Sequence, residues 1–170
     1  MATDHNGITG HGVATVVGPD GEIKQQVPFR NLITDYGDEV YAARGIGTSE
    51  DPATGMRLGT GTTAVAKNGA GAAIVTYVSE SSKEFDATFP SLSDKGAGSG
   101  HRITHQTTWD AGEATEDGIA EVVITNIAIA DVAGSAGDTI SRALLSPAVD
   151  KSADDTLEIE WHHDFQGASS

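Results

Sequence analysis

The clearest pattern of hydrophobic and polar positions lies in residues 156–165, where the two kinds of side chain alternate. The positions on one side of an extended chain are Leu157, Ile159, Trp161, His163 and Phe165, and those on the other side are Glu158, Glu160, His162 and Asp164. A period of two is that of a strand with one packed face and one face in water. The pattern predicts a half-buried strand of an antiparallel sheet, whose outer carboxylates discourage pairing with foreign strands.

The N-terminal part of the chain has the pattern of a β-hairpin. Two β-prone runs, 12–17 and 22–27, flank the turn formers Gly18-Pro19-Asp20-Gly21. Such a turn between two strand-like runs is typical of adjacent antiparallel strands.

Residues 31–44 have a different pattern, with aromatic and aliphatic side chains at helical spacing. Thr34 or Asp35 can cap the start of a helix, and Gly45 is a stop signal. A short helix is therefore expected, although Gly37 weakens it.

The remaining chain alternates between β-prone runs and loops rich in glycine, serine and aspartate. The run 119–130 is nearly continuously apolar, which fits a buried strand or a helix, and its β-branched residues favour a strand. The other expected strands are 56–58, 72–79, 80–89, 101–109 and 139–145, and the expected loops are 46–55, 92–100, 110–118, 131–138 and 147–155. Many short strands with little helix predict an all-β fold, an antiparallel β-sandwich or jelly roll with one short helix. We expect a flexible N-terminal arm at 1–10 and a single β-sandwich domain at 11–170.

Charge changes the picture of possible partners. The chain has 170 residues with 25 Asp plus Glu against 10 Lys plus Arg, a formal net charge of −15. This charge repels phosphate backbones and anionic bilayers, so neither nucleic acid nor a membrane is an expected partner. The acidity and the scarcity of lysine favour a halophilic or high-GC host, while an ordinary solubilising acidic surface is the alternative.

The chain has no cysteine, which excludes disulfides, thiolate metal sites and thiol nucleophiles. The N-terminal residues lack the basic start and apolar run of a secretory signal, and no stretch is apolar enough to span a bilayer. We therefore expect synthesis in the host cytoplasm and a soluble chain, unless it leaves within a larger particle.

Histidines are the first candidates for chemistry. His101 and His105 are four residues apart, but in a strand this spacing is about 13 Å, too far for one zinc ion. His162 and His163 point to opposite faces of their strand. A cross-strand site, such as His105 with His163, stays geometrically possible, but structural or surface histidines are the expectation.

Other chemical motifs are weak. The loop 59–63 (Gly-Thr-Gly-Thr-Thr) lacks the lysine and the following helix of a phosphate-binding loop. The chain has no Gly-x-Ser-x-Gly elbow. The carboxylates cluster without calcium-loop spacing, so solvated acidic loops are expected, with opportunistic Ca²⁺ or Na⁺ binding as the alternative; they are Asp110, Glu113, Glu116, Asp117, Asp150, Asp154 and Asp155. We expect no enzyme, no catalytic residue, no cofactor and no metal.

The large aromatic side chains are interpreted as core anchors rather than as a platform for stacking sugars. They are Phe85, Trp109, Trp161 and Phe165. Exposed Trp or Tyr on loops would instead favour a host-recognition or glycan-binding module.

Several passages in a fixed order carry a resemblance to a known class of proteins. They are 31–34 (NLIT) with 42–45 (AARG), 56–64 (MRLGTGTTA), 109–115 (WDAGEAT), 119–126 (IAEVVITN), 141–147 (SRALLSP) and 155–161 (DTLEIEW). This order resembles small structural proteins, decoration-like or tail-fibre-like, of tailed viruses that infect bacteria and archaea. The likeness spares the N-terminal hairpin and residues 80–100, and it marks strands and turns rather than binding residues.

The resemblance implies a structural virion protein whose location is the virion. The compact length favours an oligomeric capsid decoration or turret protein that stabilises the shell. Its partners would be copies of itself, in a trimer or pentamer, together with the major capsid protein or other virion proteins. The alternative is a tail-fibre, collar or baseplate protein that binds a host receptor or a glycan.

Overall fold

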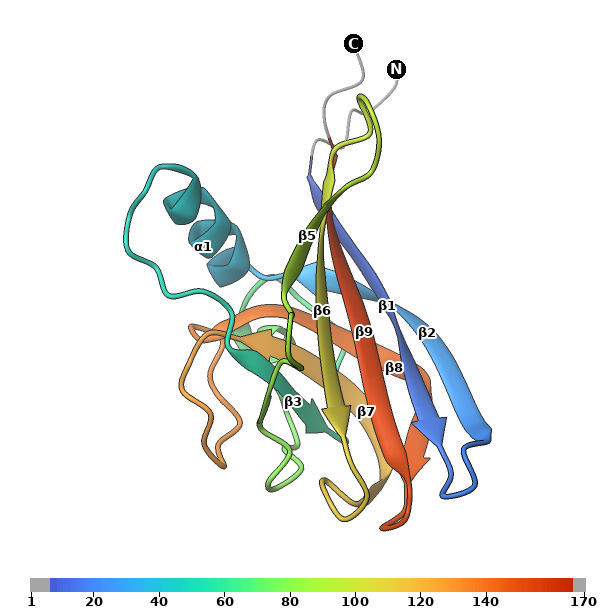
Figure 1. The fold of residues 1–170 in the computed structure, drawn as a ribbon. Coiled ribbons are helices and arrows are strands. Elements are labelled where there is room, and N and C mark those ends of the chain that lie inside the picture. The colour runs from blue at the N-terminus through green and yellow to red at the C-terminus, as the bar shows by residue number, and fades with distance from the viewer. Residues whose placement is uncertain (1–6, 167–170) are drawn as a thin grey trace.

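The structure is a computed structural model that describes residues 7–166 of the chain. It contains a long antiparallel sheet, one α-helix and one short 3-10 helix (Figure 1). The elements are β1 (Ile8–Val17), β2 (Ile23–Ile33), α1 (Asp35–Gly45), β3 (Gly55–Gly59), η1 (Gly69–Ala72), β4 (Lys83–Glu84), β5 (Ser91–Asp94), β6 (His101–Trp109), β7 (Glu116–Thr125), β8 (Thr139–Lys151) and β9 (Thr156–Phe165).

Within residues 7–166 the strands form one nine-stranded sheet in the order β4-β3-β7-β8-β2-β1-β9-β6-β5. β2 and β8 are paired only between Asn31–Ile33 and Ser141–Ala143. The sheet curls there into a half-barrel, so that β3, β7 and β8 lie behind β6, β9 and β1 (Figure 1). The all-β prediction with one short helix is confirmed, but a sandwich or jelly roll is not, because the strands belong to one continuous sheet.

The hydrophobic core fills the inside of this curl. Both tryptophans, Trp109 and Trp161, are fully buried in it, as expected for core anchors, and Phe85 packs against its edge. Aliphatic residues from both halves of the sheet surround them, among them Val16, Met56, Leu58, Val122, Ile124, Leu145, Leu157 and Ile159. Burial of such side chains is worth about 1.5–3 kcal/mol each, and the core therefore holds the two halves together.

The last strand, β9, has the bounds and the alternation that the sequence predicts. Leu157, Ile159, Trp161 and His163 are buried on the inner face. However, β9 is not an edge strand, because β1 pairs with one side of it and β6 with the other. Its outer carboxylates are therefore not needed to keep foreign strands away from its backbone.

The helix prediction is confirmed with shifted bounds, since residues 31–33 complete β2 instead. The Thr34 hydroxyl accepts a hydrogen bond from the Gly37 N–H at 2.9 Å and caps the helix. Gly37, which weakens the helix by propensity, has a packing role: a Cβ there would lie 2.0 Å from the carbonyl oxygen of Ile140. Only glycine lets α1 approach β8 this closely.

The middle of the chain differs most from its prediction. The expected strand 72–79 is a 3-10 turn and a loop, with a single bridge from Tyr77 to Gly59. Only Lys83–Glu84 of the run 80–89 is a strand, and the expected loop 92–100 contains part of β5. Packing on the outside of the sheet, described below, replaces regular strand pairing in this region.

The strands after residue 100 follow the sequence more closely. β6 has the expected bounds. Residues 119–125 of the ambiguous run 119–130 lie in β7, which confirms the strand interpretation for that part, while 126–130 lie outside the strand and β7 begins inside the expected loop 110–118. β8 continues to Lys151 and so includes part of the expected connection 147–155. At the N-terminus, Ile8–Gly10 belong to β1 and are not part of an arm, while residues 1–6 lie outside the described residues.

Candidate functional site

The structure brings two of the candidate histidines together on the inner face of the sheet. His105 of β6 and His163 of β9 have ring centroids 4.9 Å apart. Both are buried, His163 completely. The cross-strand approach that the sequence left open is therefore present, but no group of three or more His, Cys, Asp or Glu in residues 7–166 is placed to hold a metal ion.

His163 is the centre of a small polar cluster in an otherwise apolar region. Its Nδ1 lies 2.5 Å from the hydroxyl of Tyr41, and its Nε2 lies 3.1 Å from the hydroxyl of Ser141 and 3.4 Å from the amide nitrogen of Asn31. Burial lowers the pKa of His163 well below its usual value and lowers the pKa of His105 to about 4. Both rings are therefore neutral at pH 7.

The Ser141–His163 contact has the distance of a nucleophile and its base. However, both side chains have no exposed surface, so a substrate cannot reach the hydroxyl. The same burial raises the pKa of Tyr41 further above neutrality, which keeps its hydroxyl protonated. The arrangement is suited to holding elements together rather than to turnover.

The other pair of histidines lies on the outer face. His162 is next to His11 of β1, with ring centroids 5.1 Å apart, and its Nε2 lies 2.9 Å from the Glu160 carboxylate. Farther along the same face, Arg102 donates two hydrogen bonds to Asp164 and Lys95 donates a third. These two cations hold the pKa of the Asp164 carboxyl well below its usual value. The buried carboxylate is thus a fixed ion-pair centre.

The glycine-rich loop that resembles a phosphate cradle binds an internal carboxylate instead. Glu121 of β7, fully buried, accepts hydrogen bonds from the backbone N–H groups of Gly61, Val75 and Thr76 at 2.9–3.0 Å. Its other oxygen pairs with the guanidinium of the buried Arg142 at 2.6 Å. The loop therefore covers the outer face of β7 and β8.

A second buried arginine fastens the neighbouring loop. Arg57 of β3 donates to the carbonyl oxygens of Ala128 and Val132 and to the hydroxyl of Thr125. Neither arginine nor Glu121 was a candidate in the sequence. The signal that marks them is a charged residue inside an otherwise apolar strand, because an unpaired buried charge is too costly to keep.

Carboxylates of the two acidic clusters lie around the buried Lys151, whose ammonium donates to the Asp110 carbonyl at 2.9 Å. Burial lowers the pKa of Lys151, and the nearby carboxylates of Asp155, Glu113 and Asp110 act in the opposite direction. Asp155 pairs with Lys24 at 2.6 Å, and Asp150 accepts from the N–H of Gly118. Lys83 pairs with Glu113 and lies 3.8 Å from Asp110. These carboxylates cap turns and pair with lysines.

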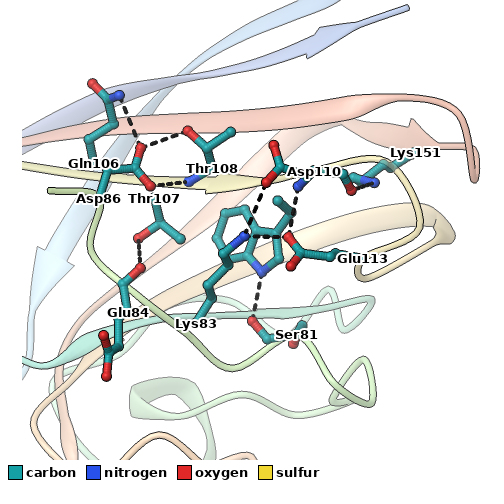
Figure 2. A network of polar contacts seen from close by, with 11 residues as sticks. Ser81, Lys83, Glu84, Asp86, Gln106, Thr107, Thr108, Asp110, Glu113 and Lys151 are labelled. Carbon is teal, nitrogen blue, oxygen red and sulfur yellow. Dashed lines mark hydrogen bonds and ion pairs between the residues drawn. The ribbon is translucent and has the colours of Figure 1, made fainter. Parts of the chain in front are cut away.

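A polar network fastens the segment around β4 to β6, as Figure 2 shows. The carboxylate of Asp86 accepts from the N–H and hydroxyl of Thr108 and from the amide of Gln106. The hydroxyl of Thr107 donates to the Glu84 carbonyl, and the Trp109 indole donates to the Ser81 carbonyl. Because β4 pairs with β3, the segment connects β3, in the rear part of the curled sheet, to β6 near its other end.

The two sheet ends and the splayed part of β2 are the places where backbone is left for a partner. β5 pairs with β6 alone among the described strands, and its four residues are exposed, with Leu92 71 % exposed. Residues 23–30 of β2 pair with β1 but not with β8. Pro28 lies in this stretch, and a strand proline removes the N–H that a new partner would need.

The hollows on the surface are open. One, of about 560 Å³, lies over β1 and β2 beside His11, Pro28 and Arg30, and another of about 530 Å³ lies next to it beside Asp38 and Lys67. Neither includes the buried histidines. No side-chain cluster of catalytic type lines either hollow.

Comparison of the chain with family models, curated proteins and solved structures finds no match. Among residues 7–166, no helix has the length and apolar character needed to cross a bilayer. The function is therefore inferred from the chain itself.

Proposed function

We propose that this chain is a structural virion protein of a tailed virus, an oligomeric capsid decoration or turret subunit that stabilises the shell. Two things support the proposal: the order of sequence passages that resembles such proteins, and the free edge of β5. The free edge is the observation that carries the assembly role. The fold that would serve this role is a curled sheet closing over its core, in place of the expected sandwich or jelly roll.

The edge of β5 is suited to pairing with another strand. Its residues Ser91–Asp94 present one row of backbone N–H and C=O groups that no other described strand uses, at the end of the sheet. Exposed edges of this kind are templates for strand addition. Leu92, opposite Ile103 in the ladder, adds an exposed apolar side chain beside the edge.

The unpaired stretch of β2 is protected in the way that soluble β-proteins protect their edges. It has Pro28 in the strand and the charged residues Lys24 and Arg30 on it. Strand addition is thus directed to the sheet ends, where β5 (Ser91–Asp94) offers a longer row of backbone than β4 (Lys83–Glu84).

Assembly through an edge also fits the charge of the chain. At −15, copies repel one another over a distance of about 8–10 Å at ordinary salt. Backbone hydrogen bonds need no charge complementarity, and repeated weak contacts on a symmetric shell add up to stable attachment.

The test is the oligomeric state of the purified chain and of two matched variants, measured by analytical ultracentrifugation at low and at molar salt. Leu92→Asp puts a charge at the β5 edge, and Ile23→Asp puts the same charge at another exposed apolar position, 60 % exposed, at the first residue of β2. A trimeric or pentameric ring needs β5 to bind a different surface of the next copy, because β5 pairing with β5 would close a dimer. We expect such a ring for the wild type and Ile23→Asp, and a monomer for Leu92→Asp. Unchanged assembly of Leu92→Asp would exclude the β5 route.

Binding assays with the same purified protein then distinguish a position on the capsid from one in the tail. A defined oligomer that co-sediments with emptied virus shells supports the decoration role. A monomer that binds cell envelopes contradicts it and favours the tail-fibre, collar or baseplate alternative. Burial of both tryptophans weighs against that alternative in its glycan-binding form, since no indole is exposed in residues 7–166 to stack on a sugar.

A further inference from the structure

The buried histidine cluster lies where the parts of the fold meet. His105 comes from β6, His163 from β9, Ser141 from β8, Asn31 from β2 and Tyr41 from α1. β8 belongs to the rear half of the curled sheet and β6 to the front half (Figure 1). A change at His163 therefore acts on both halves and on the helix.

The hydrogen bonds at His163 are those of a neutral ring, with the Asn31 amide nitrogen turned toward Nε2 and the Asn31 Oδ1 left buried without a hydrogen-bond partner. The amide nitrogen of Asn31 can only donate, so Nε2 of His163 accepts, and Nδ1 carries the proton and donates to the Tyr41 oxygen. Protonation of Nε2 would bring two donors face to face until the Asn31 amide turned over. The neutral ring is thus part of the docking geometry of α1.

His105 adds a second group that resists charge. Its Nδ1 is buried without a hydrogen-bond partner, and its ring lies between that of His163 and that of Phe85, 5.1 Å away. A positive charge on either histidine would disfavour a charge on the other at 4.9 Å. Protonation of His105 or His163 therefore requires that the ring first becomes hydrated.

The surroundings offer no carboxylate to compensate a proton. Tyr41 from α1 and the aromatic Trp161 and Phe85 face the rings. The charged or titratable groups nearest along β9 are His162 and Asp164, which lie on the outer face. Asp164 is already engaged by Arg102 and Lys95, and among the described residues no other acid is in contact with the pair.

Helix α1 is linked to the histidine pair through one side chain, that of Tyr41. Only Gly37 and Val40 of the helix are buried, while Tyr36 packs at the edge of the core and Asp38 pairs with Lys67 at the surface. Segments with little buried surface open locally at a small fraction of the global free energy.

We propose that His105 and His163 form an acid-sensitive latch that holds α1 against the sheet when neutral and releases it when protonated. The sign follows from proton linkage. The closed state has lowered histidine pKa values. Above the ordinary histidine pKa of about 6.5 both states hold neutral rings, so pH does not change their balance. As the pH falls below that value, the open state binds protons more readily and becomes favoured. If opening hydrates His105, the change from a pKa of about 4 to about 6.5 raises the open population about 30-fold at pH 5.

The experiment is hydrogen–deuterium exchange of the full chain between pH 7 and pH 5, with rates corrected for the intrinsic effect of pH. We expect protection of Asp35–Gly45 to fall at least tenfold, while protection of β7 stays constant. In His105→Phe/His163→Gln the pH response of the helix should disappear. The control, His11→Gln/His162→Gln, removes the outer-face pair and should respond like the wild type.

A second measurement does not depend on the double variant folding. Tyr41→Phe removes the hydroxyl that links the pair to the helix, and it should lower protection of α1 at pH 7 and reduce its change at pH 5. Ring nitrogen NMR of the wild type should show both inner histidines neutral at pH 6. Helix protection that is unchanged from pH 7 to pH 5, or an inner histidine that is charged at pH 6, would overturn the proposal.

Discussion

Replacement of Glu121 by glutamine tests how the outer face of the rear half of the sheet is held. The wild-type carboxylate accepts hydrogen bonds from three backbone N–H groups, of Gly61, Val75 and Thr76, and from the guanidinium of Arg142. Glu121→Gln keeps the shape but removes the charge and turns one acceptor into a donor. Arg142 is then left as an uncompensated charge with no exposed surface.

The expected cost is large for a single substitution. Breaking a buried ion pair by neutralising one partner costs about 3–5 kcal/mol. In a chain of this size that corresponds to a fall in melting temperature of about 6–20 °C. The control is Glu116→Gln, an exposed glutamate on the same strand, for which we expect a change within about 0.5 kcal/mol.

A double variant separates the role of the charge from that of the backbone bonds. In Glu121→Leu/Arg142→Met the pair becomes apolar, which by itself is often nearly neutral. The carbonyl oxygen of Thr63 and the three loop N–H groups nevertheless lose their partners, at about 1–3 kcal/mol for each group left buried, while the Gly71 carbonyl keeps the N–H of Ala66. We therefore expect the double variant to stay well below the wild type.

The assay is equilibrium unfolding in urea, followed by the fluorescence of the two buried tryptophans, with limited proteolysis of the loop around η1 as a local readout. Glu121→Gln should lower the unfolding midpoint and make the loop cleavable. A Glu121→Gln variant as stable as Glu116→Gln would refute the conclusion that the Glu121–Arg142 pair holds the loop around η1 on the sheet.

Two further changes follow from close contacts elsewhere. Gly37→Ala should lower the free energy of unfolding by about 1–3 kcal/mol. The clash of the new Cβ with the Ile140 carbonyl outweighs the gain of about 1 kcal/mol in helix propensity. A raised melting temperature would contradict this packing. Asp164→Asn should lower the melting temperature at pH 6 because Arg102 and Lys95 stabilise the carboxylate. A carboxyl with a lowered pKa contributes its full stabilisation of the fold above its unfolded pKa of about 3.9 and less below it. The difference in melting temperature between the variant and the wild type should therefore shrink at pH 3. A constant difference would show that packing, not charge, is responsible.

The parts of the fold that the sequence predicts well are those in which one local rule decides the structure. Alternation with one buried face gives β6 and β9 their bounds to the residue. The turn formers between β1 and β2 and the Thr34 cap act over a few residues as well. In these places the local preference and the tertiary contacts agree.

The prediction is wrong where apolar residues pack on a surface rather than in a ladder. Ala72 and Ile74 are buried, as the strand prediction for 72–79 requires, but they belong to a loop that covers the sheet. The N–H groups of Val75 and Thr76 bind Glu121, which is far away in sequence. A pattern of period two cannot show which partner the backbone takes.

The sequence shows only that His105 and His163 can approach each other, and it does not show the cluster that forms around them. Alternation places His105 and His163 on inner faces, but the strand order that makes β6 and β9 neighbours depends on pairings distant in sequence. Tyr41 and Ser141 join them through the docking of α1 and the curl between β2 and β8, which no local pattern specifies.

The two halves of the outer face show why the ends of the sheet matter most for partners. Over β3, β7 and β8 the face is covered by loops of the chain itself, fastened by the buried Arg57 and Arg142. Over β1, β9 and β6 the face is uncovered but polar, with half-buried Glu160 and His162 already paired to each other. A partner gains little by covering such a face, since a paired polar surface has to be desolvated first. In residues 7–166, the backbone row of β5 with Leu92 beside it combines unused hydrogen-bonding groups with exposed apolar surface, which is why the proposed assembly uses it.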